Sequence, residues 1–240
     1  FQPLIEEVSF SPYGDVDALQ NVVDKDTAFV ILEPIQGESG IHVPPEGFLQ
    51  DVRKTCDENN SLLIFDEIQS GLGRTGSMWA SEHWKTVPDI MCLAKGIAGG
   101  VPMGVTLVRP DILAVMKKGE HSSTFGGNPL ACAAGTATLQ ALTQDGLIEN
   151  AKSVGEKLSH GLEELKSKHT IIREIRGKGL MIGVELKFEV KDILMEGIKN
   201  GLLLLYSGRN ILRFLPPLVL DDEDVVKTLQ ILDNLLTNEE

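Results

Sequence analysis

The sequence comprises 240 residues, of which 42% are hydrophobic and 24% are charged, a composition that is typical of a globular protein and excludes a disordered chain. Its 22 lysines and arginines stand against 35 aspartates and glutamates, and the formal net charge of −13 would repel phosphate backbones and anionic lipid, which argues against nucleic acid or a membrane surface as a partner. Three widely spaced cysteines and five histidines without ligand spacing indicate neither a disulfide framework nor a metal site.

Four short apolar runs in the first 110 residues predict the strands of an α/β domain. They cover 28–34, 61–67, 89–95 and 104–110, and each is closed by a polar or breaking residue. Such runs are typical of strands that are buried on both faces of a parallel sheet. Between the first two runs, apolar residues recur at helical spacing over 45–60, so that strand, helix and strand form a βαβ unit.

The remainder of the chain predicts two helices, then further strands and a closing helix. The Ala-rich stretch 128–143 and the amphipathic stretch 145–169 have helical patterns. Strands are expected within 179–188, 201–210 and 210–220, and the closing helix over 221–236. We therefore place a domain boundary near residue 145, with a mostly parallel α/β large domain over 1–144 and a smaller α+β C-terminal domain over 145–240.

Ionisable residues stand at the ends of three predicted strands: Glu33, Asp66 with Glu67, and Lys95. Any one of them alone is more simply a strand-end residue turned to solvent. Open parallel sheets, however, bind ligands outside the carboxyl ends of their strands, so the three together predict a site. Lysine condenses with carbonyls, and a carboxylate that faces a pyridinium nitrogen completes the arrangement of a pyridoxal phosphate enzyme. We expect Lys95 to hold this cofactor as an imine and to move the proton, while Asp66 keeps the ring nitrogen protonated.

Two other motifs in the sequence resemble those of different enzyme classes. The stretch GLGRTG at 71–76 matches the dinucleotide-binding pattern GxGxxG, but it begins several residues after the apolar run and has no acidic residue at the ribose position. The stretch GESGI at 37–41 ends in isoleucine and so fails the GxSxG pattern of a serine hydrolase. Neither a dinucleotide enzyme nor a serine hydrolase is favoured.

Six motifs spread along the chain together resemble one family. They are ILEPIQGESG (31–40), LLIFDEIQSGLGRTG (62–76), PDIMCLAKGIAGGVPMG (88–104), HSSTFGGNPLA (121–131), IRGKGLMIG (175–183) and ILRFLPPL (211–218). In this order they resemble the class III, or ω-amino-acid, pyridoxal phosphate aminotransferases, and most closely the acetylornithine and acetyl-lysine branch of arginine and lysine biosynthesis. The resemblance implies the fold-type I architecture of pyridoxal phosphate transferases and a homodimer.

The resemblance also implies roles for individual cofactor-binding residues. Lys95 would form the imine and Asp66 would pair with the pyridinium nitrogen. Gln69 would hydrogen-bond near the ring hydroxyl, and Ile68 would pack under the ring. The neighbouring pair Ser123 and Thr124 would reach the cofactor phosphate of the other subunit, which makes the dimer necessary for function.

For the substrate, the resemblance assigns the α-carboxylate of glutamate or 2-oxoglutarate to Arg213, because a planar guanidinium captures a carboxylate with two hydrogen bonds. Glu38 would pair with Arg213 as a gate that closes for the ω-amine substrate and opens for glutamate. Glu33 is expected to support the loop and is a weaker candidate as a direct substrate ligand. The expected reaction transfers the terminal amine of an N-acylated or carrier-tagged ornithine or lysine to 2-oxoglutarate.

Several alternatives remain open at this stage. Free ornithine or 4-aminobutyrate would keep the chemistry with another substrate, and a catalytically silent scaffold or dimerisation subunit would keep only the fold. A carrier-tagged substrate would bring an acidic carrier protein, which the negative net charge does not encourage. Relatives are longer at the N-terminus, where a phosphate-binding Gly-Thr turn and a ring-stacking aromatic residue are expected. Because the sequence also begins without methionine and shows no signal peptide, we expect part of a longer, cytoplasmic enzyme that is poorly active as this piece alone.

Overall fold

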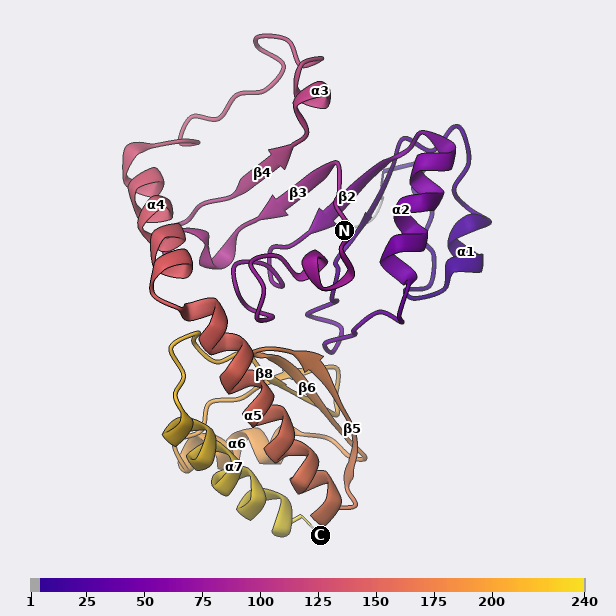
Figure 1. Cartoon of the computed structure of the whole chain (residues 1–240). Helices are drawn as coiled ribbons and strands as arrows, with labels where there is room; N and C mark the ends of the chain where they lie inside the picture. Colours follow the sequence, from indigo (N-terminus) through magenta and orange to yellow (C-terminus); the bar gives the residue numbers. More distant parts are fainter. Residues whose placement is uncertain (1–4, 240) are drawn as a thin grey trace.

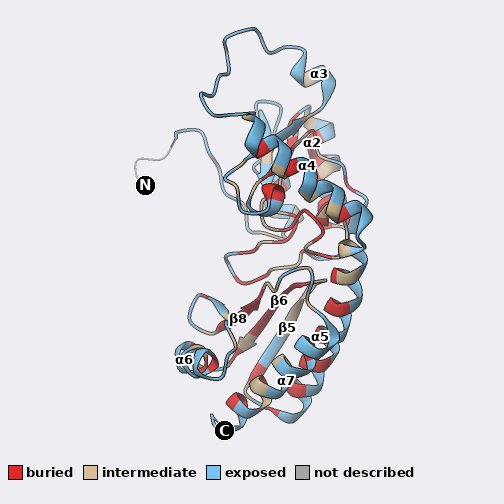
Figure 2. Cartoon of the chain, turned by 90° about the vertical axis from the view of Figure 1, so that its left-hand side faces the viewer, coloured by how far each residue is buried: buried red, intermediate tan, exposed pale blue. Residues whose placement is uncertain are grey.

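The described part of the chain folds around two four-stranded sheets, one N-terminal and one C-terminal (Figure 1). The structure is a computed structural model and describes residues 5–239. Figure 2 shows that buried residues follow the strands of the C-terminal sheet and the inner faces of the helices that cover it. Within the described residues, no helix combines the length and the apolarity that crossing a membrane requires.

The N-terminal sheet has the strand order β1-β2-β3-β4, with bounds Phe29–Leu32, Leu62–Asp66, Ile90–Leu93 and Val105–Val108. The first three strands are parallel, as predicted, whereas β4 runs antiparallel to β3. The prediction of a parallel fourth strand is therefore wrong. The short connection between β3 and β4, which contains the 3₁₀ helix η2 (Lys95–Ala98), explains the reversal, because a parallel return needs a longer crossover.

The helix α2 (Phe48–Asn59) confirms the predicted βαβ unit. Its apolar side chains, which include the fully buried Leu49, form one core with Leu63 and Phe65 of β2. The short helix α1 (Val16–Gln20), which was not predicted, lies against α2. The prediction that the strands are buried on both faces is wrong for β1. Phe29 and Ile31 on this edge strand are 51% and 56% exposed, because the described part of the chain covers only the opposite face.

A buried carboxylate joins the N-terminal strands to each other. Asp89, just before β3, is 4% exposed and accepts hydrogen bonds from the Leu63 N–H at 2.8 Å and from Arg53 at 2.9 Å. Arg109, just after β4, pairs with its other oxygen at 2.5 Å. Burial alone would raise the pKa of Asp89, but these hydrogen bonds and positive charges lower it below the ordinary value.

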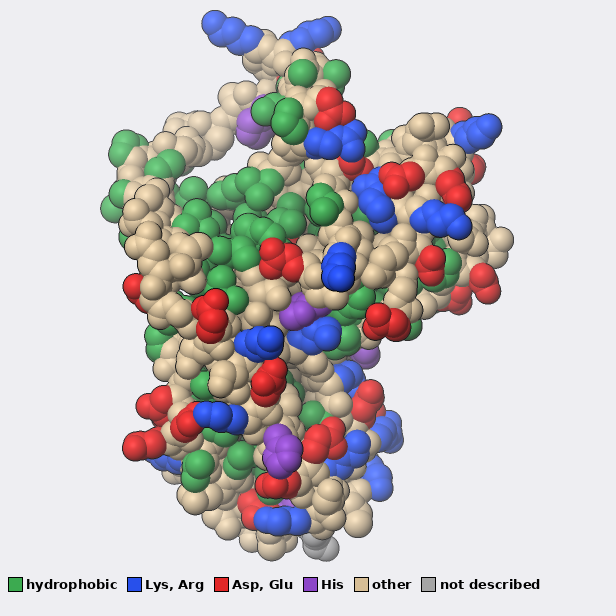
Figure 3. Space-filling view, viewed as in Figure 1, with side chains coloured by type: hydrophobic (Ala, Val, Ile, Leu, Met, Phe, Trp, Pro, Cys, Tyr) green, Lys and Arg blue, Asp and Glu red, His purple; other side chains and the backbone are tan. Residues whose placement is uncertain are grey.

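Helices α4 (Pro129–Gln144) and α5 (Leu147–Lys168) confirm the two predicted helices and lead from one sheet to the other (Figure 1). Asn128 caps α4 by accepting the Ala131 N–H, and Gly146, in the left-handed region, separates the two helices. Apolar side chains gather between α4 and the strands β3 and β4 (Figure 3). The short helices α3 (Pro110–Leu113) and η1 (Ala80–Trp84) complete this part.

The C-terminal sheet is antiparallel, in the order β5-β6-β8-β7, with bounds Ile172–Lys178, Met181–Leu186, Ile211–Phe214 and Leu205–Ser207. Helices α5 and α7 (Asp222–Thr237) pack together over its core, and α6 (Lys191–Lys199) follows β6. The strand predicted over 201–210 shrinks to three residues because Gly201 turns the chain first, and the one over 210–220 ends before Pro216 and Pro217. Strand β5 and helix α6 were not predicted.

A turn of the C-terminal sheet fastens the two parts together. Between β5 and β6, Leu180 exchanges hydrogen bonds with Arg74: its N–H donates to the Arg74 carbonyl at 3.0 Å and its carbonyl accepts from Arg74 Nη1 at 3.2 Å. Gly179 of the same turn lies so close to α5 that a Cβ on Gly155 would come within 2.3 Å of it. The motif IRGKGLMIG therefore belongs to the junction between the two sheets.

Candidate active site

The ends of three adjacent parallel strands bring ionisable side chains together. Glu33 directly follows β1, Asp66 ends β2, and Lys95 lies two residues beyond β3. The charges of Asp66 and Lys95 both act on the Glu33 carboxyl, raising and lowering its pKa respectively. The three residues that sequence reasoning placed in one site are thus within electrostatic reach of one another at one edge of the sheet.

Lys95 occupies an unusual backbone position. Its φ of 47° lies in the left-handed region, and its side chain is exposed. Within residues 5–239 its amine makes no hydrogen bond or close ion pair, although the carboxylates of Glu33 and Glu38 are near enough to feel its charge. The tight turn after β3 therefore presents the Lys95 amine without a hydrogen-bond or close ion-pair partner among the described side chains.

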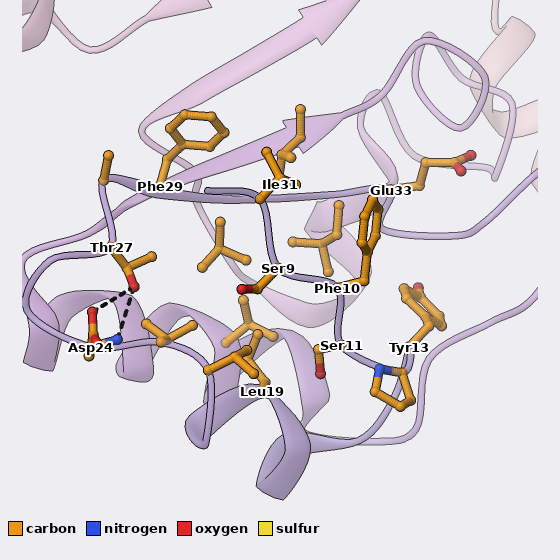
Figure 4. A pocket seen from close by; sticks show the side chains of 18 of the residues that line it. Ser9, Phe10, Ser11, Tyr13, Leu19, Asp24, Thr27, Phe29, Ile31 and Glu33 are labelled. Atoms are coloured by element: carbon orange, nitrogen blue, oxygen red, sulfur yellow. Dashed lines mark hydrogen bonds between the residues drawn. The ribbon is translucent and has the colours of Figure 1, made fainter. Parts of the chain in front are cut away.

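Asp66 is half-buried at the end of a groove of about 860 Å³. One of its oxygens, Oδ1, accepts the N–H of Ile68 at 2.9 Å, which turns the chain at the end of β2 and leaves the second oxygen available. The groove lies between β1 on one side and residues 7–13 with helix α1 on the other, and Phe29, Ile31 and Glu33 are among the residues that line it (Figure 4).

The neighbouring Glu67 points to the opposite side of the strand, as successive residues of a strand do. It is fully buried, and its carboxylate accepts hydrogen bonds from Ser70 Oγ at 2.7 Å and from the N–H groups of Ser81 and Ala80 at 2.8 and 3.1 Å. These contacts hold η1 against the end of β2. Of the two acids at this strand end, only Asp66 belongs to the site.

Glu33 supports the loop that follows it. Its Oε2 accepts the Gly37 N–H at 2.9 Å. Burial raises the pKa of the Glu33 carboxyl, the Gly37 N–H opposes that rise, and the negative charge of Asp66 adds to it. The phenol of Tyr13, whose pKa burial also raises, donates to the Pro34 carbonyl at 2.8 Å and closes this corner of the groove.

A buried arginine meets an exposed glutamate beside these residues. Arg213, on β8, is 6% exposed, and its Nη1 and Nη2 each lie 3.0 Å from a carboxylate oxygen of Glu38, whose side chain is 73% exposed. Gln69 Nε2 donates to the same carboxylate at 2.8 Å. These hydrogen bonds, first from Arg213 and then from Gln69, hold the pKa of Glu38 below its ordinary value. The Glu38–Arg213 pair joins the N-terminal to the C-terminal part of the chain.

Gln69 carries a polar atom that the described chain leaves unsatisfied. Its Oε1 is buried without a hydrogen-bond partner, and it sits so close to Gly37 that a Cβ there would lie 1.9 Å away. A buried acceptor without a donor is costly, so a ligand hydroxyl or N–H at this point would be favoured.

Three groups therefore stand ready for a ligand: the Lys95 amine, the second oxygen of Asp66 and Gln69 Oε1. They match a molecule that carries a carbonyl, a basic ring nitrogen and a ring hydroxyl, which are the groups of pyridoxal phosphate. Ile68, half-buried, stands between Asp66 and Gln69 in sequence. On an α/β sheet with these groups at its strand ends, the site fits the fold-type I class of pyridoxal phosphate proteins.

Similarity to known proteins identifies the family within that class. The profile of aminotransferase class III matches residues 5–236, so the chain belongs to the class III aminotransferases, whose cofactor is pyridoxal phosphate. It is 47% identical over 238 residues to acetylornithine aminotransferase of Caldanaerobacter subterraneus subsp. tengcongensis, covering 99% of this chain and 60% of that protein. Ornithine aminotransferase 1 of Staphylococcus saprophyticus is 42% identical, with 98% and 60% covered. The chain thus spans about 60% of the length of these relatives.

Among solved structures, ornithine aminotransferase from Toxoplasma gondii, described with partial occupancy of PLP at its active site, superposes with a TM-score of 0.95 at 37% identity. The match covers 99% of this chain and 58% of that one. The fold-type I α/β architecture expected from the sequence is therefore confirmed.

Two predicted residues lie apart from the others. Ser123 and Thr124 are exposed on the long connection between α3 and α4, where Ser123 Oγ accepts the Gly126 N–H at 2.9 Å. Phe125 beside them is 80% exposed. Within the described chain these residues make no contact with Lys95 or Asp66.

Sequence reasoning missed two residues that touch the loop of Glu38. Ser207, on β7, donates to the Glu38 carbonyl at 2.5 Å, and Arg176, on β5, donates through Nε to the Gly40 carbonyl at 3.0 Å. Arg176 lies in the motif IRGKGLMIG and could have been singled out from it. Ser207 follows a run of leucines, and nothing in its sequence context marks it.

Proposed function

We propose that the protein transfers the terminal amine of an ornithine-type substrate to 2-oxoglutarate, giving a semialdehyde and glutamate. The observation that carries this proposal is the Glu38–Arg213 pair beside Lys95 and Asp66. Such a reaction needs one pocket to accept first a substrate whose reacting carbon bears no carboxylate, and then one whose reacting carbon does. A buried arginine that an exposed glutamate covers satisfies both requirements.

The chain's own residues would divide the work as follows. Lys95 would hold the cofactor and carry the proton between carbon atoms from its amine, and Asp66 would keep the ring nitrogen protonated by charge pairing. Gln69 would accept from the ring hydroxyl through Oε1, and Ile68 would pack under the ring. When bound, pyridoxal phosphate supplies the electron sink that makes the substrate C–H bond acidic.

Arg213 and Glu38 would select between the two substrates. Arg213 is fixed, because it is buried and its Nη1 also donates to the Gly37 carbonyl at 3.1 Å. Glu38 can rotate away from the pair, since most of its side chain is in solvent and water would replace the hydrogen bonds from Arg213 and Gln69. A glutamate α-carboxylate would take its place on the guanidinium. Glu33 would hold the loop in position through Gly37.

The proposed substrate is more specific than the family assignment alone implies. We favour an N-acylated ornithine, supported by 47% identity to an acetylornithine aminotransferase, in a role in arginine biosynthesis. Free ornithine is the second candidate, supported by 42% identity to an ornithine aminotransferase. N-acylated or carrier-tagged lysine and 4-aminobutyrate are further alternatives for the substrate screen. A catalytically silent scaffold would not need Lys95, Asp66 and Arg213 together.

We further propose a homodimer in which Ser123 and Thr124 reach the cofactor phosphate of the other subunit. The exposed Phe125 and Leu130 beside them, 80% and 70% exposed, support an apolar contact at this place. We also propose a domain boundary near residue 145, which the break at Gly146 and the apolar cluster formed wholly by residues 151–236 support.

The visible spectrum of the protein with added pyridoxal phosphate, recorded before and after glutamate, tests the proposal. We expect an absorption band that glutamate bleaches and that 2-oxoglutarate restores, and we expect Lys95→Ala to lose the covalent adduct. The matched control is Lys118→Ala, on the exposed connection after α3. Lys178→Ala is unsuitable because the half-buried Lys178 lies over the Trp84 ring. A band that survives Lys95→Ala as a covalent adduct would refute the assignment, and comparable rates on free 4-aminobutyrate would refute the ornithine-type substrate.

A further inference from the structure

The loop that carries Glu38 is held by its main chain. We define the gate loop as residues 36–41. Three of its carbonyl groups accept hydrogen bonds from side chains of the C-terminal sheet: Arg213 Nη1 on Gly37, Ser207 Oγ on Glu38 and Arg176 Nε on Gly40, at 3.1, 2.5 and 3.0 Å. The donors come from three different strands, β8, β7 and β5.

The burial of these groups divides the loop into a fixed and a free part. The side chains of Arg176 and Arg213 are 10% and 7% exposed, and Ser207 is 4% exposed, whereas the Glu38 side chain is 73% exposed. The main chain of the gate loop is thus bound in a dry contact, while its one carboxylate stands in solvent. Movement of the gate is therefore expected in the side chain and not in the backbone.

The backbone of the gate loop needs this support. Gln36 and His42 exchange main-chain hydrogen bonds at 3.0 and 2.9 Å, which closes the loop tightly. Ile41 has a φ of 58°, an unfavourable value for a β-branched residue, and is fully buried. A conformation of this kind persists only when surrounding contacts fix it.

Of the three donors, only Ser207 makes a single contact that does not depend on the state of the gate. Arg213 also binds the Glu38 carboxylate and would exchange it for substrate, and Arg176 also pairs with Glu174 and Glu185. The Ser207 hydroxyl has no other hydrogen bond within the described chain and reaches the carbonyl of the gate residue itself.

We propose that Ser207 is a positioning residue that fixes the main chain at Glu38, so that the gate closes by a rotation of the Glu38 side chain alone. This inference rests on the proposed function. Loosening the main chain would weaken the closed Glu38–Arg213 pair, which the ω-amine half-reaction requires. Glutamate brings its own carboxylate to Arg213 and does not need the pair closed. Ser207 therefore sets the preference between the two substrates.

The test compares Ser207→Ala, Ser207→Thr and the control Ser167→Ala in the native protein that contains this chain. Ser167 also donates its hydroxyl to a main-chain carbonyl, that of Glu163 at 3.0 Å, but lies exposed on α5. Loss of one buried hydrogen bond corresponds to about a fivefold to tenfold change. We expect Ser207→Ala to lower kcat/KM for N-acetylornithine by this factor, mainly through KM, and to change kcat/KM for glutamate by less than about twofold. Ser207→Thr, which keeps the hydroxyl, should restore the first value, and Ser167→Ala should change neither.

Hydrogen exchange of the main chain provides a readout that does not depend on turnover. The amides of Gln36 and His42 should exchange about fivefold faster in Ser207→Ala than in the unaltered protein, and at the unaltered rate in Ser167→Ala. Unchanged exchange, or an equal loss in both half-reactions, would overturn the inference. If the unaltered protein transfers no amine from glutamate, the proposed function is wrong, and the exchange rates alone decide whether Ser207 anchors the loop.

Discussion

Replacing Arg213 by leucine separates the role of this residue in substrate binding from its role in the fold. In the structure the guanidinium makes one hydrogen bond, from Nη2, and one further ion-pair contact, from Nη1, with the Glu38 carboxylate, both at 3.0 Å, and the α-carboxylate of glutamate would take over both. A charge-assisted hydrogen bond contributes about 1.5–3 kcal/mol, so the loss of this bond together with the ion-pair contact amounts to about 3 kcal/mol. This predicts a fall of about two decades in kcat/KM for glutamate and 2-oxoglutarate.

The same replacement should cost the fold much less. It leaves the buried Gly37 carbonyl without its donor, but it also removes Arg213 Nε, which is buried without a partner. Glu38, largely in solvent already, regains water and its pKa rises toward the ordinary value. We therefore expect the free energy of unfolding to fall by only about 1 kcal/mol, because the two buried polar terms partly offset each other.

The assay measures both half-reactions by the absorbance of the cofactor, with unfolding in urea measured beside them. The matched control is Arg173→Leu, which removes an arginine that pairs with Glu185 on the same sheet but is 58% exposed and makes no hydrogen bond with the gate loop within the described chain. Arg173→Leu should leave both half-reactions unchanged. Equal losses in the two half-reactions of Arg213→Leu, or an unchanged reaction with glutamate, would refute the assignment of the carboxylate site.

Three further predictions concern stability and thiol reactivity. Asp89→Asn should lower the free energy of unfolding by about 2 kcal/mol in urea, less than for a fully buried ion pair because one of its two arginines is half exposed. Because the pKa of Asp89 is lowered in the folded protein, its contribution is present above the ordinary aspartate pKa of about 3.9 and is lost as the pH falls through the folded value, so the stabilities of the two proteins should converge in acid. Gly155→Ala should lower the melting temperature by forcing a Cβ against Gly179, at a cost of about 1–3 kcal/mol, whereas an unchanged melting temperature would show that this contact yields freely. Burial raises the pKa of Cys56 to about 11, so a thiol reagent at pH 8 should modify exposed Cys132 and spare Cys56 until the protein is unfolded; rapid modification of Cys56 would contradict its burial.

The sequence predicted much of the fold because local patterns govern its principal elements. Apolar runs identified β1 to β3, and helical periodicity identified α2, α4, α5 and α7 within a few residues. Sequence patterns failed to predict strand direction and strand length where a turn or a contact distant in sequence determined them. The direction of β4 depends on the short turn through Lys95, and the length of β7 depends on Gly201 and on its pairing with β8. Neither the direction of β4 nor the length of β7 can be predicted from the hydrophobic periodicity of the strand itself.

The candidate site divides in the same way. Residues at strand ends, Glu33, Asp66 and Lys95, could be grouped from the sequence because parallel strands share one carboxyl edge. The partnership of Glu38 and Arg213 came only from a family resemblance, since 175 positions separate them and no local rule joins them. Ser207 could not be predicted from the sequence, because its proposed role depends on its hydrogen bond to the Glu38 carbonyl and not on its neighbours along the chain.

By itself, then, the sequence determined the class of chemistry, because a lysine and a carboxylate at strand ends are local features of a buried parallel sheet. The tertiary structure decided which side chains of the C-terminal sheet donate hydrogen bonds to the gate loop. Hydrogen bonds between side chains and distant carbonyl groups form only when the chain has folded, and they leave no periodic trace in the order of the residues. The proposed cofactor-binding groups can therefore be identified from the sequence, whereas the proposed control of the gate depends on the contact between the two sheets.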